Sequence, residues 1–218
     1  WILIGAIVGS RLFHCFVYWE DYASDPIEIL KIWKGGLVFY GGFILATLFT
    51  VTFCLYHKLR WITFADAMAP ALMLGLLFGR MGCLHAGCCF GKPTDLPWAI
   101  TFPSAGGLGT AGVPLHPTQM YEALAAFLIC LTVLSFRKEK RFEGQPFLVM
   151  IVLYAVARSA IEAVRADPRG FVHVAGYAVS ESQMVSAVVG PPALLLLVYL
   201  MWKHRGAPAL AEREAQAA

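Results

Sequence analysis

Charged residues are scarce: Asp, Glu, Lys and Arg make up 14% of the 218 residues, whereas a soluble domain carries about 25%. Hydrophobic residues make up 59% before glycine is counted. This composition excludes a disordered chain, a coiled coil and an ordinary soluble enzyme, and it indicates an integral membrane protein. The formal net charge is only +3, so the chain lacks the basic footprint of a nucleic-acid-binding protein.

The chain also lacks the alternating hydrophobic pattern of membrane strands and shows no internal repeat of the solenoid or inverted-transporter kind. It does not begin with Met. Its first residues, WILIGAIVG, have neither the charged region nor the cleavage site of a signal peptide. We therefore expect a fragment whose true N-terminus is missing.

Six apolar stretches are long enough to cross a bilayer as helices, which takes about 17–25 residues. They cover residues 1–19, 36–56, 62–81, 118–136, 146–165 and 183–202. The sequence therefore predicts an all-α integral membrane protein, a polytopic bundle of six transmembrane helices. We expect one transmembrane domain over residues 1–203 and a disordered cytoplasmic tail over residues 204–218.

Lys and Arg gather in every second connection. Three connections together hold 9 Lys and Arg in 31 residues, and the others hold 4 in 70. The basic connections are residues 57–62, 137–145 and 203–218, and the others are residues 20–35, 81–118 and 166–181. By the positive-inside rule the basic group is cytoplasmic, so we expect the chain to begin and end on the cytoplasmic side.

Ionisable side chains gather on one face of the stretch 146–165. Tyr154, Arg158, Glu162 and Arg165 are spaced by four, four and three residues, which places them on the same side of a helix. A charge inside the membrane costs about 2.5–3.5 kcal/mol on insertion scales, so each one requires a reason. One interpretation is an ion-pair ladder that joins helices. The other is an anion site, because two arginines against one glutamate leave a positive charge.

Two further arginines lie in apolar stretches. Arg80, in the sequence GLLFGRMGC, either extends to the membrane surface or binds a ligand. The flanking Gly79 and Gly82 would let the backbone approach another group closely. Arg11 receives less weight, because its side chain can extend to the surface.

The helix predicted from residue 118 begins with polar residues. Pro117 suits a helix start, and His116 comes just before it. Gln119 and Glu122 are three residues apart. Glu122 is either a carboxylate stabilised by the helix dipole or part of a site.

The segment GGLVFYGG, residues 35–42, brackets Tyr40 with four glycines. Two interpretations remain open. In the first, the four glycines allow helices to pack closely. In the second, the backbone surrounds a bound head group and Tyr40 points into it.

Three of the six cysteines, Cys83, Cys88 and Cys89, cluster in GCLHAGCCFG with His85 between them. The outer face of a membrane permits disulfides, so Cys83 can link to Cys88 or Cys89. Three thiols and one imidazole are also enough ligands for a metal, but adjacent cysteines make tetrahedral closure awkward. We therefore predict no metal and no cofactor.

Seven motifs, taken together and in this order, resemble the bacterial prolipoprotein diacylglyceryl transferase family. They are GSRLF (9–13), GGLVFYGG (35–42), GRMG (79–82), LPWAITFP (96–103), HPTQMYEAL (116–124), YAVARSAIEAVRAD (154–167) and SESQMVS (180–186). The resemblance covers nearly the whole chain. It implies seven spans in the parent protein, and the six predicted here fit the loss of the first.

The family transfers a diacylglyceryl group from phosphatidylglycerol to the thiol of a lipobox cysteine in a prolipoprotein, which forms a thioether and releases glycerol phosphate. The resemblance therefore implies a multi-pass transferase of the bacterial inner membrane with its site toward the periplasmic side. The implied partners are phosphatidylglycerol, the lipobox peptide and membrane lipids, with no nucleic acid.

The resemblance also assigns residues. Arg80 and Arg158 match the family's essential arginines, while Tyr154, Glu162 and Arg165 match its supporting positions. The matches to its signature glycines are Gly79, Gly82 and Gly87. As catalytic residues we predict Arg80, Arg158, His116 and Tyr40, and as substrate-binding residues Arg80, Gly79, Gly82, Tyr154, Glu162, Arg165, Gln119 and Glu122.

The chain departs from the family pattern at two places. After GRMG the family continues with Asn and then Asn-Gly-Glu, where this chain has Cys83 and the residues 86–88. Many members carry His where this chain has Tyr40, and the resemblance implies that this His is the base in those members, so here Tyr40 or His116 would have to serve. We favour His116 narrowly over Tyr40, with ionisation of the substrate thiol by the arginine field as a rival.

Two other functions compete with the transferase. A membrane thiol-redox protein would use Cys83, Cys88 and Cys89. A small-molecule transporter would use an intramembrane Arg–Glu gate, but no pair of interrupted helices in matching positions supports it.

Overall fold

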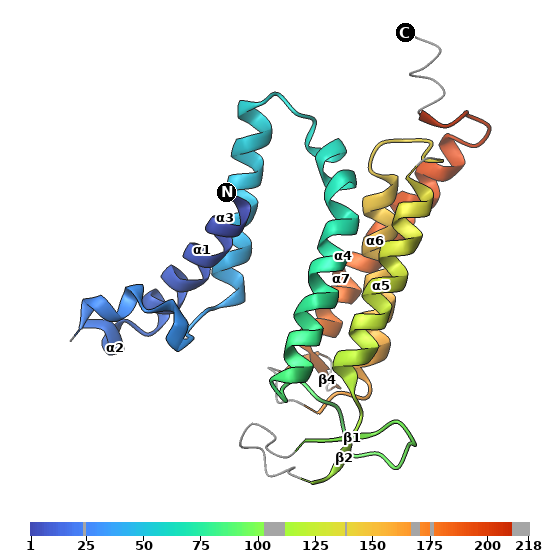
Figure 1. The fold of residues 1–218 in the computed structure, drawn as a ribbon. Coiled ribbons are helices and arrows are strands. Elements are labelled where there is room, and N and C mark those ends of the chain that lie inside the picture. Colours follow the sequence, from blue (N-terminus) through green and yellow to red (C-terminus); the bar gives the residue numbers. More distant parts are fainter. Residues whose placement is uncertain (24, 103–111, 138, 167–170, 175–176, 211–218) are drawn as a thin grey trace. The chain divides into compact units, whose positions relative to one another are not determined.

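The computed structural model is mainly helical, with two short hairpins in the connections (Figure 1). It describes the chain except residues 24, 103–111, 138, 167–170, 175–176 and 211–218. The helices are α1 (Ile2–Val17), α2 (Trp19–Ala23), α3 (Phe39–Tyr56), α4 (Trp61–His85), α5 (Thr118–Phe136), α6 (Gln145–Glu162) and α7 (Glu181–Lys203). Two short 3-10 helices, Pro26–Leu30 and Ile32–Lys34, follow α2.

Among the described residues, the five helices α3 to α7 are long and apolar enough to cross a membrane. Helix α1 is apolar as well but has only 16 residues. The predicted class, an all-helical membrane protein, agrees with this architecture, and six spans with a cytoplasmic C-terminus stay predictions. Three boundaries differ from expectation by three residues or more: α3 begins only at Phe39, α4 continues to His85, and α6 ends at Glu162.

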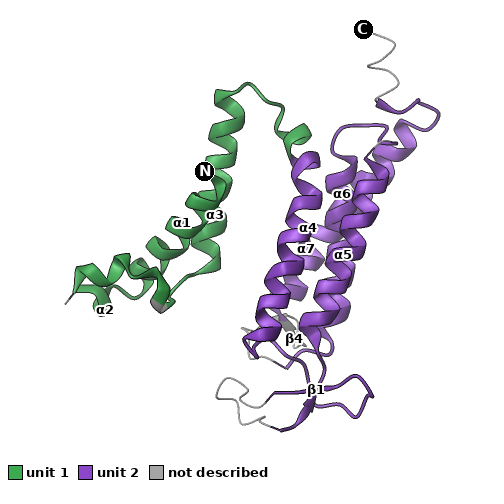
Figure 2. Ribbon diagram, in the orientation of Figure 1, with its two compact units in different colours: residues 1–64 green, residues 65–218 purple. Residues whose placement is uncertain are grey.

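The chain divides into two compact units, Trp1–Phe64 and Ala65–Ala218 (Figure 2), and each is described by itself. The predictions of one transmembrane domain over residues 1–203 and a disordered tail remain untested. The last eight residues of that tail lie outside the described part of the chain.

In the first unit α1 packs against α3, and glycines make the contact close. A Cβ on Gly9 would lie 2.4 Å from the carbonyl oxygen of Gly41, and one on Gly42 would lie 2.2 Å from Oγ of Ser10. Close packing of small residues therefore accounts for the last two glycines of GGLVFYGG.

Arg11 of α1 is 5% exposed and holds the segment that connects α1 to α3. Its guanidinium donates hydrogen bonds to the carbonyl oxygens of Ile29 at 2.9 Å, Gly35 at 2.7 Å and Gly36 at 3.2 Å. It also donates to the carbonyl oxygen of Glu28. Arg11 therefore does not simply extend to the surface: it satisfies backbone groups inside its own unit.

In the second unit α4, α5 and α6 share a buried core. Its members are Ala69, Met73, Ile129, Cys130, Val133 and Met150. A second core joins α6 to α7 and consists of Phe142, Leu148, Ala193 and Leu197. These cores pair α6 with helices on two sides, so residues on α6 can contact both α5 and α7.

Two hairpins in the connections were not predicted. Strand β1 (Ile100–Thr101) pairs with β2 (Pro114–Leu115), and β3 (Phe171–Val174) pairs with β4 (Tyr177–Ser180), both antiparallel. Phe90, Phe102 and Leu115 form a small core at the first hairpin. Because β2 ends three residues before α5, this hairpin fixes the approach of the chain to that helix.

Asp66 of α4 caps the start of α6. The N-cap residue of α6 is Gly144, which has no side chain to bond the first N–H groups of the helix. Asp66 accepts hydrogen bonds from the backbone N–H of Gly144 at 2.8 Å and of Phe147 at 3.2 Å, and Nζ of Lys140 lies 3.5 Å away. The carboxylate is 5% exposed, and it lies where the helix dipole favours negative charge.

We expect Asp66→Ala to lower the free energy of unfolding by about 1–3 kcal/mol, because it removes the carboxylate that accepts hydrogen bonds from two backbone N–H groups at the start of α6. Thermal unfolding of the detergent-solubilised chain, followed by circular dichroism, measures the change. Asp95→Ala is the matched control, since Asp95 is exposed. Equal melting temperatures for the two variants would show that Asp66 does not stabilise α6.

Candidate active site

Glu122 of α5 joins three arginines in the second unit. Its side chain is 1% exposed. Its Oε1 accepts hydrogen bonds from Nη1 of Arg158 at 2.7 Å and from Nη1 of Arg165 at 3.1 Å. Its Oε2 pairs with Nε of Arg80, and Nη2 of Arg158 lies 2.5 Å from Oε2 of Glu162. We call these five residues the arginine cluster.

Different segments supply the members of the arginine cluster. Arg80 lies in the last two turns of α4, and Arg158 and Glu162 are one turn apart on α6. Arg165 follows the end of α6, where a backbone bridge pairs it with Gly91. A Cβ on Gly91 would lie 2.5 Å from the carbonyl oxygen of Val164, so glycine alone allows this approach.

Helix α7 contributes its N-terminus. The hydroxyl of Ser180 accepts a hydrogen bond from the N–H of Gln183 at 3.2 Å, which together with the reverse bond forms a capping box. Ser182 accepts a hydrogen bond from Nη2 of Arg158 at 2.6 Å. The positive end of the α7 dipole therefore adjoins Arg158. Ser182 was not predicted as a site residue, and only its place in the SESQMVS motif pointed to it.

The arginine cluster carries a formal charge of +1, from three arginines and two glutamates. Arg158 and Arg165 are each 6% exposed, so water screens the charge poorly. The arginine cluster therefore fits both interpretations of the Arg–Glu pattern, the ion-pair ladder and the anion site. A ladder joins α4, α5 and α6, and the excess positive charge suits an anion. Glu122 is therefore more than a carboxylate at a helix start.

Arg80 is flanked by open space. Among the described residues, nothing lies within 4 Å of a Cβ placed on Gly79 or on Gly82. The close approach predicted for these glycines is therefore not made by the described part of the protein. The side chain of Arg80 is 15% exposed, against 7% for Arg158 and 3% for Arg165. Arg80 is thus the arginine of the cluster most open to a ligand.

The first turn of α5 holds the segment that follows α4. Oγ1 of Thr118 donates a hydrogen bond to the carbonyl oxygen of Cys89 at 2.7 Å, and Nε2 of Gln119 donates one to that of Cys88 at 2.6 Å. Oε1 of Gln119 is buried and has no hydrogen-bond partner in the described part of the chain. Gln119 precedes Glu122 by one helical turn, so this acceptor lies on the face of α5 that carries the arginine cluster.

The thiol of Cys88 is a poor nucleophile. Burial, and after it the neighbouring thiols of Cys89 and Cys83, raises the pKa of the Cys88 thiol to about 12. The thiolate is the nucleophilic form of cysteine, so this raised pKa disfavours the free Cys88 thiol as a nucleophile.

His116 lies in a chain of polar aromatic residues. Its Nδ1 is 3.2 Å from the hydroxyl oxygen of Tyr121, which also accepts a hydrogen bond from Nε1 of Trp98 at 2.8 Å. These contacts orient the imidazole and leave Nε2 as its second polar atom. Neither Trp98 nor Tyr121 was predicted as a site residue, and the only signal for them is their place in the motifs LPWAITFP and HPTQMYEAL.

Tyr154 packs against the core shared by α4, α5 and α6, one turn before Arg158. Tyr40 belongs to the first unit, at the second position of α3, and its side chain is 57% exposed. The arginine cluster lies wholly within the second unit, so the role predicted for Tyr40 stays a prediction.

The architecture and the arginine cluster define a class: a polytopic helical membrane protein with a buried, net-positive site. A family model described as prolipoprotein diacylglyceryl transferase matches residues 1–202. The chain therefore belongs to the prolipoprotein diacylglyceryl transferase family, as its motifs predicted.

Similar proteins carry the name phosphatidylglycerol–prolipoprotein diacylglyceryl transferase. One from Finegoldia magna is 38% identical over 77% of this chain and 64% of its own length. One from Clostridium tetani is 34% identical over 84% of this chain and 72% of its own length. One from Nitrosomonas europaea is 32% identical over 97% of this chain and 75% of its own length. The chain thus spans less than two thirds of the first of these relatives and about three quarters of the last.

We expect Glu122→Gln to lower the free energy of unfolding by about 3–5 kcal/mol, because it leaves buried arginines without their shared carboxylate. Thermal unfolding in detergent measures the loss. Glu139→Gln removes the same charge at an exposed position and should leave the melting temperature unchanged. A Glu122→Gln variant as stable as this control would contradict the pairing.

Proposed function

We propose that the chain provides the reaction centre of a phosphatidylglycerol–prolipoprotein diacylglyceryl transferase. This enzyme would move the diacylglyceryl group of phosphatidylglycerol to the lipobox cysteine of a prolipoprotein. The observation that carries the proposal is the buried arginine cluster, net positive among helices suited to a membrane. The names of the relatives support the same reaction.

In the proposed reaction the sulfur of the substrate cysteine attacks the diacylglyceryl carbon that bears the phosphate. A carbon–sulfur bond forms, and the carbon–oxygen bond to the phosphate breaks. The electron pair of that bond leaves with glycerol phosphate, and the thiol proton passes to a base. The phosphate gains one negative charge in this step, so groups that bind the departing anion accelerate the transfer.

Arg80 and Arg158 are the groups we propose for binding the phosphate. A guanidinium binds two phosphate oxygens with parallel hydrogen bonds, and these strengthen where water is scarce. Arg80 is the more exposed and would meet the phosphate first. Arg165 and Glu162 would keep the pair in place, and open space beside Gly79 and Gly82 gives the head group room.

Two features of the site support the binding of a lipid with a glycerol head group and acyl chains. The buried Oε1 of Gln119 lacks a partner among the described residues, and a hydroxyl of the head group would satisfy it. A groove of about 420 Å³ lies between α6 and α7. It is lined mainly by apolar residues such as Val152, Ala155 and Leu194. Gln183 also lines it and is next in sequence to Ser182, which accepts a hydrogen bond from Arg158. We propose that one acyl chain occupies this groove.

The base we propose is His116. Histidine titrates near neutral pH and accepts a proton when neutral. The oxygen of Tyr121 can accept Nδ1–H of His116, which leaves Nε2 free to take the thiol proton. The phenol of Tyr40 is a poorer base at neutral pH and is better suited to orient the phosphate. Stabilisation of the substrate thiolate by the arginines is the alternative.

We further propose a placement in the bacterial inner membrane, with the arginine cluster toward the periplasmic side. The distribution of Lys and Arg among the connections supports it, and so does the arrival of prolipoproteins on that side. Six spans and a cytoplasmic C-terminus follow from the same argument.

The natural full-length protein should restore diacylglyceryl addition to a lipobox precursor in cells depleted of their own transferase. Arg158→Lys should lower the transfer rate about 10- to 100-fold, because it keeps the charge but loses the two parallel hydrogen bonds to phosphate. Mass spectrometry of the precursor, normalised to the amount of enzyme in the membrane, gives both results.

Arg137→Lys is the matched control, since Arg137 is exposed, and it should leave the rate unchanged. Full activity of Arg158→Lys would exclude bidentate phosphate binding at that position. An unmodified precursor in cells that hold normal amounts of the natural protein would exclude the transferase itself.

His116→Gln should change the shape of the pH–rate profile. With a histidine base, the rate falls as the pH drops and the imidazole becomes protonated. The variant should lose this acidic limb, and its rate should recover at high pH, where the substrate thiol ionises without help. An unchanged profile with a near-normal rate would exclude His116 and favour ionisation by the arginine field.

A further inference from the structure

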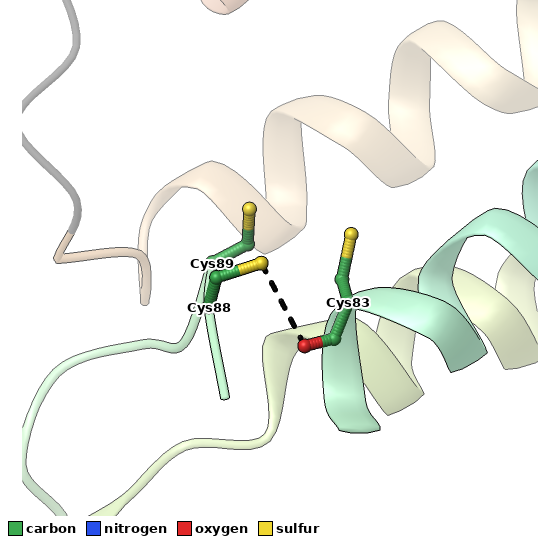
Figure 3. Close-up of side chains that lie close together, drawn as sticks. All are labelled: Cys83, Cys88 and Cys89. Carbon is green, nitrogen blue, oxygen red and sulfur yellow. Dashed lines mark hydrogen bonds between the residues drawn. The ribbon is translucent and has the colours of Figure 1, made fainter. Parts of the chain in front are cut away.

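The thiols of Cys83, Cys88 and Cys89 converge on one point. Their Sγ atoms all lie within 4.8 Å of one another. Cys83 lies in the last turn of α4, and Cys88 and Cys89 lie in the segment that follows (Figure 3). All three side chains are partly exposed, unlike the buried thiols of Cys15, Cys54 and Cys130, so an ion from solution can reach them.

Adjacent cysteines make tetrahedral closure around a metal awkward, but the backbone here has an unusual conformation that brings the thiols together. Gly87 has φ +64° and Cys89 has φ +63°, both in the left-handed region. This conformation is uncommon for a residue other than glycine, and it turns the chain back toward α4. The N–H of Cys88 donates a hydrogen bond to the carbonyl oxygen of Cys83 at 3.1 Å. Strain of this kind occurs where the surrounding structure requires it, often at functional sites.

The spacing of the thiols suits a metal ion. Thiolates bound to Zn²⁺ at about 2.3 Å in tetrahedral geometry are about 3.8 Å apart, so the three sulfur atoms would have to move together by no more than about 1 Å. A disulfide would use only two of the three thiols. The convergence of all three therefore favours an ion.

Neighbouring groups already hold the cysteines in place. The carbonyl oxygens of Cys88 and Cys89 accept the hydrogen bonds from Gln119 and Thr118 described above. Metal sites are commonly supported by such bonds around the ligands. An ion at this point would join the end of α4 to the start of α5.

We propose that Cys83, Cys88 and Cys89 bind one Zn²⁺ ion, with the fourth position taken by water or an added ligand. Binding exchanges the protons of the three thiols for the ion, and no oxidation occurs. The proposed site departs from the sequence-based expectation of no metal and is independent of the reaction proposed above. It would stabilise the segment that connects Arg80 on α4 to Glu122 on α5.

The test uses the full chain, purified in detergent with reduced thiols and stripped of metal. Titration with Zn²⁺ should give one ion per chain by elemental analysis, and titration with Cd²⁺ should give an ultraviolet thiolate charge-transfer band. Cys83→Ser and Cys88→Ser should each lower the affinity for Zn²⁺ at least tenfold. Cys54→Ser, at a buried cysteine outside the cluster, should bind as the unaltered chain does.

A second measurement on the unaltered chain does not depend on how the variants fold. Bound Zn²⁺ should slow alkylation of Cys83 and Cys89, mapped by mass spectrometry, while Mg²⁺ should not. Equal alkylation with and without Zn²⁺ would overturn the proposal. So would a stable disulfide within the cluster that persists under mild reduction, or Zn²⁺ binding that survives replacement of all three cysteines.

Discussion

The second unit depends on one buried carboxylate. Glu122 lies where Arg80, Arg158 and Arg165 meet, and none of these arginines could be buried among apolar helices without a counter-charge. The pairing explains why charged residues are tolerated in a chain that otherwise has so few. It also explains why the site is not neutral, since two glutamates balance only two of three arginines. Stability and anion binding thus depend on the same contacts between arginines and glutamates.

A comparison with Arg11 shows that an arginine in an apolar helix is not by itself a site. Arg11 donates its hydrogen bonds to backbone carbonyl oxygens of its own unit, so its charge is used within the fold. Arg80 instead pairs with a carboxylate that two other arginines share, and open space adjoins it among the described residues. What distinguishes the two is the partner, and partners are set by tertiary structure.

This difference also marks how far the sequence could predict the structure. Hydropathy located the long helices because the membrane fixes their length and composition. The i, i+4 spacing placed Arg158 and Glu162 together correctly. The partners from α5 and α7 could not be derived in this way, since Glu122 and Ser182 lie on other helices and their own surroundings are compatible with simple capping. The hairpins were missed because the strands are only two to four residues long, too short for a clear period.

Two carboxylates determine how α4 aligns with α5 and α6. Between lipid-facing helices the hydrophobic effect gives little preference for one register over another, because lipid is as apolar as leucine. Asp66 fixes α4 against the start of α6, and the pair of Arg80 with Glu122 fixes α4 against α5 about 20 Å further along the helix, at 1.5 Å per residue. A helix held at two points cannot slide or rotate freely. The guanidinium groups are thereby positioned before any anion arrives, and this preorganisation is what stabilisation of a departing phosphate requires.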